Sequence, residues 1–199
     1  MKHIIIIASI ALSCVPAFAI VDSSFAGTMS ADSLYTVDGY LGGGYVYNLS
    51  SFPYGVDGLS RNGYNAYARV MWSPNHMLDV GVEFGFTTLY KINPAQKTAV
   101  DYTALNAYPI YLVMSMEPIN RISISAGFGT AILASVVNDY QTQTAVTTAS
   151  TSVFLAARYM WPLADKVRLG LEARASTFDR FKDINASFNV VLAYSLIRY

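Results

Sequence analysis

Residues 78–87 read LDVGVEFGFT, and their pattern is the clearest indication of the fold in this chain. Apolar side chains occupy every second position from Leu78 to Phe86, and acidic or small residues, including Asp79 and Glu83, lie between them. Because successive side chains of a β-strand point to opposite faces, one face of this segment is apolar and the other is polar. A helix would instead scatter the two acids around its axis. We therefore interpret the stretch as a β-strand with one face in an apolar environment.

The same alternation recurs along the chain. It is clear in five further segments, 64–72, 122–132, 153–161, 167–177 and 186–196. Two weaker segments complete the set: 37–48, whose glycines suggest close packing or strong curvature, and 102–115, whose phase changes near Pro109, where we predict a β-bulge. The connections between these segments alternate between long and short, which is typical of an up-and-down barrel. The pattern predicts eight antiparallel strands.

The composition favours lipid over water as the surroundings of these strands. Hydrophobic residues make up 53% of the chain and charged residues only 13%, about half the charged share of a soluble domain. After the N-terminal apolar run, no stretch approaches the ~20 apolar residues of a spanning helix. In hydrocarbon every backbone N–H and C=O must be paired within the protein, which leaves a closed sheet as the spanning structure. We predict an all-β fold, an eight-stranded antiparallel up-and-down transmembrane β-barrel. A soluble secreted β-sandwich is the alternative, and it would be extracted without detergent.

The N-terminus has the three parts of a secretory signal. Lys2 is the positive flank, residues 4–15 are apolar, and Ala17-Phe18-Ala19 is a small-x-small cleavage site. We expect a signal peptide over residues 1–19, a periplasmic lead-in over 20–36 and the barrel domain over 37–199. Cleavage after residue 26 is one alternative, and lipidation at Cys14 is another.

Removal of the signal changes the chemistry that the chain offers. It takes away Lys2 and Cys14, the only cysteine, so the exported chain has no thiol chemistry and one more acidic than basic residue. No net basic field then attracts nucleic acid, and we expect no nucleic-acid partner.

The connections give an orientation. The short turns 73–76, 117–120 and 162–165 each carry a proline and are expected in the periplasm, whereas the long loops 49–62, 88–101 and 137–149 are expected outside the cell. The loop 138–150 is rich in Thr, Gln, Ala and Ser, and it is either an adhesive tip or a tolerant linker. Trp72 and Trp161 precede short turns at lipid-facing positions and predict an aromatic girdle. Tyr64, with Tyr90 and Phe178, is predicted for the outer girdle.

Residues 38–45, DGYLGGGY, the strand 78–85 with its inward acid, and the terminal Tyr199 carry a family resemblance. In these features the chain resembles the small outer-membrane β-barrel superfamily that includes the outer membrane protein A barrel, OmpW-like and opacity-type proteins. The resemblance implies a place in the bacterial outer membrane, with lipid and lipopolysaccharide as its surroundings. It also implies that Tyr199 is the assembly signal read by the barrel-assembly machinery.

Charged side chains on the predicted inner face are the candidate site. This lumen charge network comprises Arg69, Asp79, Glu83, Arg121, Arg158, Arg168, Glu172 and Arg174. An eight-stranded barrel is only wide enough for side chains to fill, so the charges can serve to pair with one another and fix the register. The alternative is a salt-bridge gate in a narrow, mildly anion-preferring channel.

Catalysis finds no support in the residues. The exported chain has one histidine, His76, in a predicted turn, and no G-x-S-x-G motif, so we predict neither enzyme activity nor a cofactor or metal. Asp179 and Asp183 are either a contact for a divalent cation or lipopolysaccharide, or a solvated loop. The predicted function is an envelope-structural or surface adhesin or antigen role, with loops meeting host or neighbouring-cell ligands. The alternative is a small porin-like channel for ions or apolar solutes.

Overall fold

The computed structural model describes residues 35–50, 59–74, 78–92, 100–139, 143–178 and 183–198. The strands in these ranges are β1 (Tyr35–Asn48), β2 (Leu59–Ser60), β3 (Asn62–Pro74), β4 (Leu78–Ile92), β5 (Val100–Ile119), β6 (Ile122–Asp139), β7 (Gln143–Ala164), β8 (Val167–Phe178) and β9 (Asp183–Arg198). Among the described residues, no helix has the length and apolar character needed to cross a membrane. The predicted signal peptide, nearly all of the lead-in, His76 and Tyr199 lie outside the described residues.

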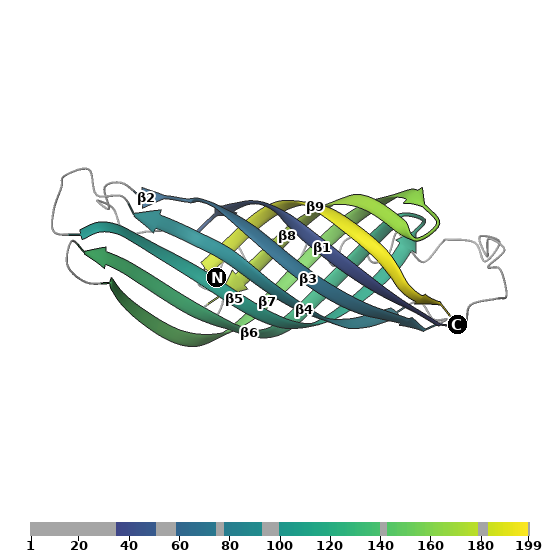
Figure 1. The fold of residues 1–199 in the computed structure, drawn as a ribbon, viewed down its shortest axis with the longest axis horizontal. Helices are drawn as coiled ribbons and strands as arrows, with labels where there is room; N and C mark the ends of the chain where they lie inside the picture. Colours follow the sequence, from purple (N-terminus) through teal and green to yellow (C-terminus); the bar gives the residue numbers. More distant parts are fainter. Residues whose placement is uncertain are drawn as a thin grey trace, which may run out of the picture. The chain divides into compact units, whose positions relative to one another are not determined.

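Eight of the described strands close into a ring, which confirms the predicted architecture. Each strand pairs antiparallel with its neighbours in sequence, and the first strand, β1, pairs with the last, β9, from Thr36↔Arg198 to Asn48↔Asn185. The two-residue strand β2 is an appendage, because it pairs only with the end of β4. Figure 1 shows tilted strands that wrap around a common axis, with β9 ending beside the start of β1.

The alternation seen in the sequence is the alternation between lumen and outer surface. On β4, Val82 and Phe84 are 58% and 65% exposed, whereas Glu83 between them is 1% exposed. The other strands repeat this: large apolar side chains cover the outside, and polar, small or aromatic side chains fill the inside. Because so large an apolar surface is not stable in water, the outer face is the lipid-facing surface of a membrane-spanning barrel.

The glycines of β1 allow close contact between this strand and the side chains and backbone that pack against it. Gly42 faces inward beneath the ring of Tyr67, and an added Cβ would lie within 2.6 Å of the Tyr67 hydroxyl. An added Cβ on Gly44 would meet the backbone of β9, 2.7 Å from the Cα of Asn189. The interpretation of this segment as one of close packing therefore holds.

The predicted bulge at Pro109 is wrong. The register of β4 and β5 is the same on both sides of it, with Phe84↔Ile110 before and Thr87↔Ala107 after. The ring of Pro109 is accommodated by Gly85, because a Cβ added to that glycine would lie only 3.2 Å from the proline Cγ. The register shift occurs further along, between Thr88 and Tyr90 of β4.

The predicted loop 138–150 is also largely wrong, because most of it is strand. β6 continues to Asp139 and β7 begins at Gln143, and the ladder between them runs without a shift from Ile122↔Tyr159 to Asn138↔Gln143. The β-branched residues of this segment, threonines and a valine, favour an extended backbone. The short turns are displaced as well: those that the structure describes lie at residues 120–121 and 165–166.

Candidate functional site: the lumen charge network

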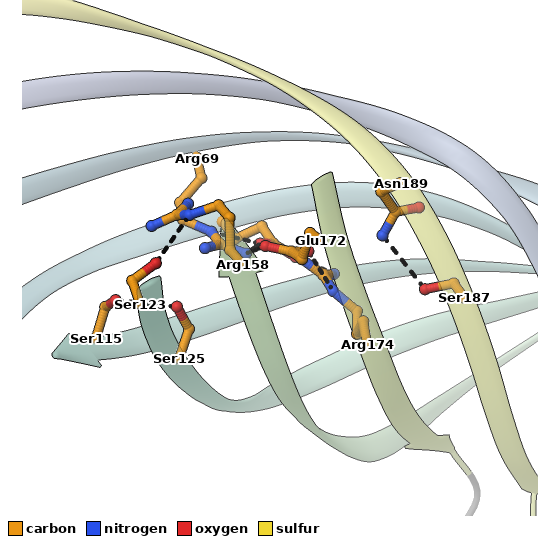
Figure 2. Close-up of polar contacts among 10 residues, drawn as sticks. Arg69, Ser115, Ser123, Ser125, Arg158, Glu172, Arg174, Ser187 and Asn189 are labelled. Atoms are coloured by element: carbon orange, nitrogen blue, oxygen red, sulfur yellow. Dashed lines mark hydrogen bonds and ion pairs between the residues drawn. The ribbon is translucent and has the colours of Figure 1, made fainter. Parts of the chain in front are cut away.

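Four members of the predicted network form one cluster of ion pairs inside the barrel (Figure 2). Arg69 Nη2 lies 2.6 Å from Glu83 Oε2 and 3.3 Å from Glu172 Oε2. Arg174 Nη1 lies 2.7 Å from Glu83 Oε1, and its Nη2 lies 2.9 Å from Glu172 Oε1. Each carboxylate therefore contacts two guanidinium groups, and each guanidinium contacts two carboxylates.

The strand register explains how these residues meet. Arg69 and Glu83 are directly opposite each other on β3 and β4. Glu172 and Arg174 are two residues apart on β8, so both point into the lumen. Contacts between Arg69 and Glu172 then cross the lumen and join residues 103 positions apart in the chain. The cluster ties opposite walls of the barrel together.

This cluster is sealed from solvent. The side chains of Arg69, Glu83 and Glu172 are 0% exposed, and that of Arg174 is 6% exposed. Buried charges are tolerated only when they are paired and hydrogen-bonded, and this arrangement supplies several charge-assisted hydrogen bonds. Removing a single partner would leave an uncompensated charge in a medium of low dielectric constant.

Aromatic rings pack against the guanidinium groups. Arg174 Cζ lies 4.3 Å from the ring centroid of Tyr67 and 4.2 Å from that of Phe154. Arg69 Cζ contacts the same two rings at 5.1 and 5.6 Å. The ring of Tyr111 meets Phe154 edge-on, with the centroids 4.8 Å apart. These cation–π contacts fill the lumen around the charges.

A second ion pair lies near the end of the barrel where β1 begins. Arg168 Nη2 is 2.5 Å from Asp38 Oδ2, and Asp38 Oδ1 accepts a hydrogen bond of 2.7 Å from the Ser195 hydroxyl. Asp38 was not among the predicted network members. The neighbouring glycines of β1 obscure the alternation of side chains in the sequence. Tyr40, two residues from Asp38, is buried on the same face of the strand, and its large side chain was the signal in the sequence that Asp38 points inward.

The remaining predicted members behave differently from one another. Arg158 is buried in the lumen, and its Nε donates a hydrogen bond of 3.0 Å to Ser123 Oγ. Asp79 is half-buried and forms no ion pair with any residue that the structure describes. Arg121 lies outside the lumen: it is an exposed turn residue with φ of 73°, because β5 continues to Ile119 and moves the turn onto it.

The aromatic residues predicted for the girdles are mostly on the outer surface. Trp72 and Trp161 are 43% and 40% exposed at the end of the barrel that holds the short turns, and Tyr64 is 54% exposed toward the other end. Phe178 is instead 1% exposed and packs inside the barrel with Leu89. Phe178 is an even number of residues from Glu172 along β8, so both side chains lie on the inner face of the barrel.

Among the described residues, no group of three or more His, Cys, Asp or Glu side chains is placed to hold a metal ion. Asp179 lies outside the described residues, so the predicted contact for a cation or lipopolysaccharide at that loop stays a prediction.

Solved structures share this architecture. Neisserial surface protein A is 11% identical, with a TM-score of 0.51 over 82% of this chain and 98% of that one. The attachment invasion locus protein Ail of Yersinia pestis, in complex with the heparin analogue sucrose octasulfate, is 11% identical, with a TM-score of 0.52 over 82% of this chain and 99% of that one. Both are eight-stranded outer-membrane barrels. No protein-family model matches the chain. No curated protein matches its sequence. At this identity the likeness establishes the fold, and the protein therefore has the architecture of the small eight-stranded β-barrels of the bacterial outer membrane.

Proposed function

We propose that the protein is a closed outer-membrane barrel that does not conduct, and that its role is to hold extracellular loops at the cell surface or to support the envelope. The observation that carries this proposal is the sealed ion-pair cluster of Arg69, Glu83, Glu172 and Arg174, which spans the lumen with side chains at most 6% exposed. A continuous water column would have to pass these groups, and water would then solvate them. Aromatic and methionine side chains such as Tyr67, Phe154 and Met71 occupy the space around them.

Conductance in a planar lipid bilayer tests this proposal. The chain, refolded and inserted, is expected to give no discrete current steps. The matched comparison is the charge reversal Glu172→Lys, with Glu117→Lys, at an exposed position near the end of β5, as its control. Reproducible steps from the unaltered chain, altered by Glu172→Lys and not by Glu117→Lys, would refute a closed barrel and establish the salt-bridge gate.

The loops supply the surface that such a barrel would present. The predicted extracellular segments 49–62, 88–101, 137–149 and 179–183 hold five basic and five acidic residues, so they carry no net positive charge. The Ail structure contains a sulfated saccharide analogue, and a polyanion of that kind favours a basic surface. We therefore propose that the loops of this chain contact uncharged surfaces through their aromatic and hydroxyl side chains, such as Tyr54 and Phe181.

Binding to immobilised heparin tests the choice of ligand class. The refolded barrel is expected to pass through at physiological salt, whereas a barrel whose Asp179 and Asp183 are both changed to Asn should be retained more strongly. Salt-sensitive retention of the unaltered chain would contradict the assignment to uncharged partners.

A further inference from the structure

Arg158 differs from the other arginines that face the barrel interior. Arg69, Arg174 and Arg168 each form ion pairs with a carboxylate, but Arg158 forms none with any residue that the structure describes. It is nevertheless only 4% exposed. A guanidinium group remains charged at every physiological pH, so its burial without a carboxylate in direct contact is costly.

The hydrogen bonds of Arg158 are incomplete. Its Nε donates to Ser123 Oγ, and its Cζ lies 4.3 Å from the ring centroid of Tyr40. Its Nη1 is buried and has no hydrogen-bond partner among the described protein atoms. A buried donor of a charged group without an acceptor is among the least favourable features that a folded protein can retain.

A second donor of the same kind belongs to Arg69. Its Nε and Nη2 bind carboxylates, but its Nη1 is buried without a protein partner among the described residues. Glu172 connects the two arginines, because it contacts Arg69 and lies opposite Arg158 in the register of β7 and β8. Figure 2 shows Arg69 and Arg158 at the same end of the cluster, away from Arg174.

Serine hydroxyls adjoin this pair of donors. Ser123 accepts from Arg158, so its own hydroxyl proton is available to a further acceptor. Ser125 donates to Ser115 at 3.0 Å, which leaves the Ser115 proton available as well. All three serines are at most 7% exposed, and Figure 2 shows them beside Arg69 and Arg158.

Charge balance indicates what the site would take. The inner cluster holds Arg69, Arg158 and Arg174 against Glu83 and Glu172, an excess of one positive charge. Asp79, the remaining inward acid of this part of the barrel, is half-buried one residue from the start of β4, and its charge interacts with that of Arg158 through space. It forms no ion pair with Arg158 in the described structure.

We propose that Arg158, Arg69 and Ser123 bind one small monovalent anion of the chloride class inside the lumen. Such an anion accepts several N–H and O–H donors, balances the single excess charge and has no carbon skeleton to fit among packed side chains. A divalent anion would overcompensate the charge, and a larger anion would not fit among the packed side chains. The site lies within the lumen packing and requires no continuous path for ions, so it does not depend on the proposed surface role.

The test compares sodium chloride with sodium gluconate at equal ionic strength on the refolded chain in detergent micelles. Urea unfolding is followed by tryptophan fluorescence. Because an anion that binds only the folded state stabilises it by mass action, chloride at ten times the dissociation constant raises the folding equilibrium constant about elevenfold. The rise should saturate with chloride, and bromide should replace chloride. Equal stability in chloride and gluconate across the salt series would overturn the proposal and leave water as the partner of the two donors.

Three variants locate the effect. Arg158→Gln should remove the chloride dependence, whereas Arg168→Gln, at the arginine paired with Asp38, should keep it. Asp79→Asn should keep or strengthen it, because a nearby negative charge opposes anion binding. If Arg158 were instead neutralised by Asp79, the Asp79→Asn variant would gain a chloride dependence that the unaltered chain lacks, and the proposal would fail. Should Arg158→Gln not fold, the chloride titrations of the unaltered chain and of Asp79→Asn decide the matter.

Discussion

Glu83→Gln removes one negative charge from the centre of the lumen while it keeps the shape of the side chain. In the folded barrel both Glu83 oxygens accept hydrogen bonds from guanidinium groups: Arg69 Nε at 2.7 Å, Arg174 Nη1 at 2.7 Å and Arg174 Nη2 at 2.9 Å. A glutamine side chain keeps one acceptor oxygen for these donors and has an NH₂ group, itself a donor, in place of the second oxygen. The positive charges of Arg69 and Arg174 then lie near each other with less negative charge between them.

The magnitude follows from the burial of the group. Breaking a buried ion pair by removing one partner costs about 3–5 kcal/mol, because the other charge stays behind in a low dielectric. Glu83 is 1% exposed and holds two arginines, so we expect a loss in this range. That corresponds to a fall of about a hundredfold or more in the folding equilibrium constant.

Urea unfolding in lipid vesicles or detergent, monitored by the fluorescence of Trp72 and Trp161, measures the loss. The matched control is Glu117→Gln at an exposed position near the end of β5, where Glu117 Oε1 accepts a hydrogen bond of 2.6 Å from the backbone N–H of Arg121; its cost should stay within about 1 kcal/mol. In a double-mutant cycle with Arg174→Met, the loss of folding free energy in the double variant should be smaller than the sum of the losses in the two single variants. A loss for Glu83→Gln no larger than that for Glu117→Gln would refute the view that the cluster holds the barrel walls together.

Two further predictions concern the barrel wall. Phe84→Arg places a charge on a lipid-facing side chain that is 65% exposed and should cost about 2–4 kcal/mol of folding free energy, against about 0–1 kcal/mol for Tyr64→Arg near the interface; equal costs in vesicle unfolding would contradict the assigned depth. Gly44→Val drives a side chain into the backbone of β9 and should abolish the heat-sensitive migration of a folded barrel on a denaturing gel, whereas Gly43→Ala, whose Cβ would lie 3.3 Å from Asn65 O, should preserve it. Normal migration of the Gly44→Val protein would show that β1 and β9 are not held in this register.

Most of the fold prediction came from the alternation of side chains between the two faces of a β-strand. Alternation alone identified the inward direction of Arg69, Glu83, Glu172 and Arg174, because each lies in a segment whose outer face is apolar without interruption. It could not show that Arg69 reaches Glu172, since that contact depends on the curvature and tilt that bring β3 across from β8.

The errors have separate causes, of which the first is that alternation gives no information on where a strand ends. Arg121 was assigned to the lumen because β5 was expected to stop at Ser115, whereas it continues to Ile119 and shifts the turn. Asp38 was missed because glycines on the same strand have no side chain with which to show a face. The orphaned Nη1 atoms of Arg158 and Arg69 depend on side-chain conformation, which no pattern in the sequence reports.

The pairing of β1 with β9 has a consequence for the order of events in folding. Thr36 and Arg198 are partners in the sheet, so the ring cannot close until the final strand is available. The contacts that join distant strands, such as Arg168 to Asp38, 130 residues apart, carry a large loop-closure entropy that no local contact offsets. The ion pairs that join β3 to β8 and β1 to β8 therefore form only as the wall closes, whereas Arg69 pairs with Glu83 as soon as β3 and β4 meet. The final strand therefore completes the hydrogen bonds of the sheet and the ion pairs across the lumen in the same step.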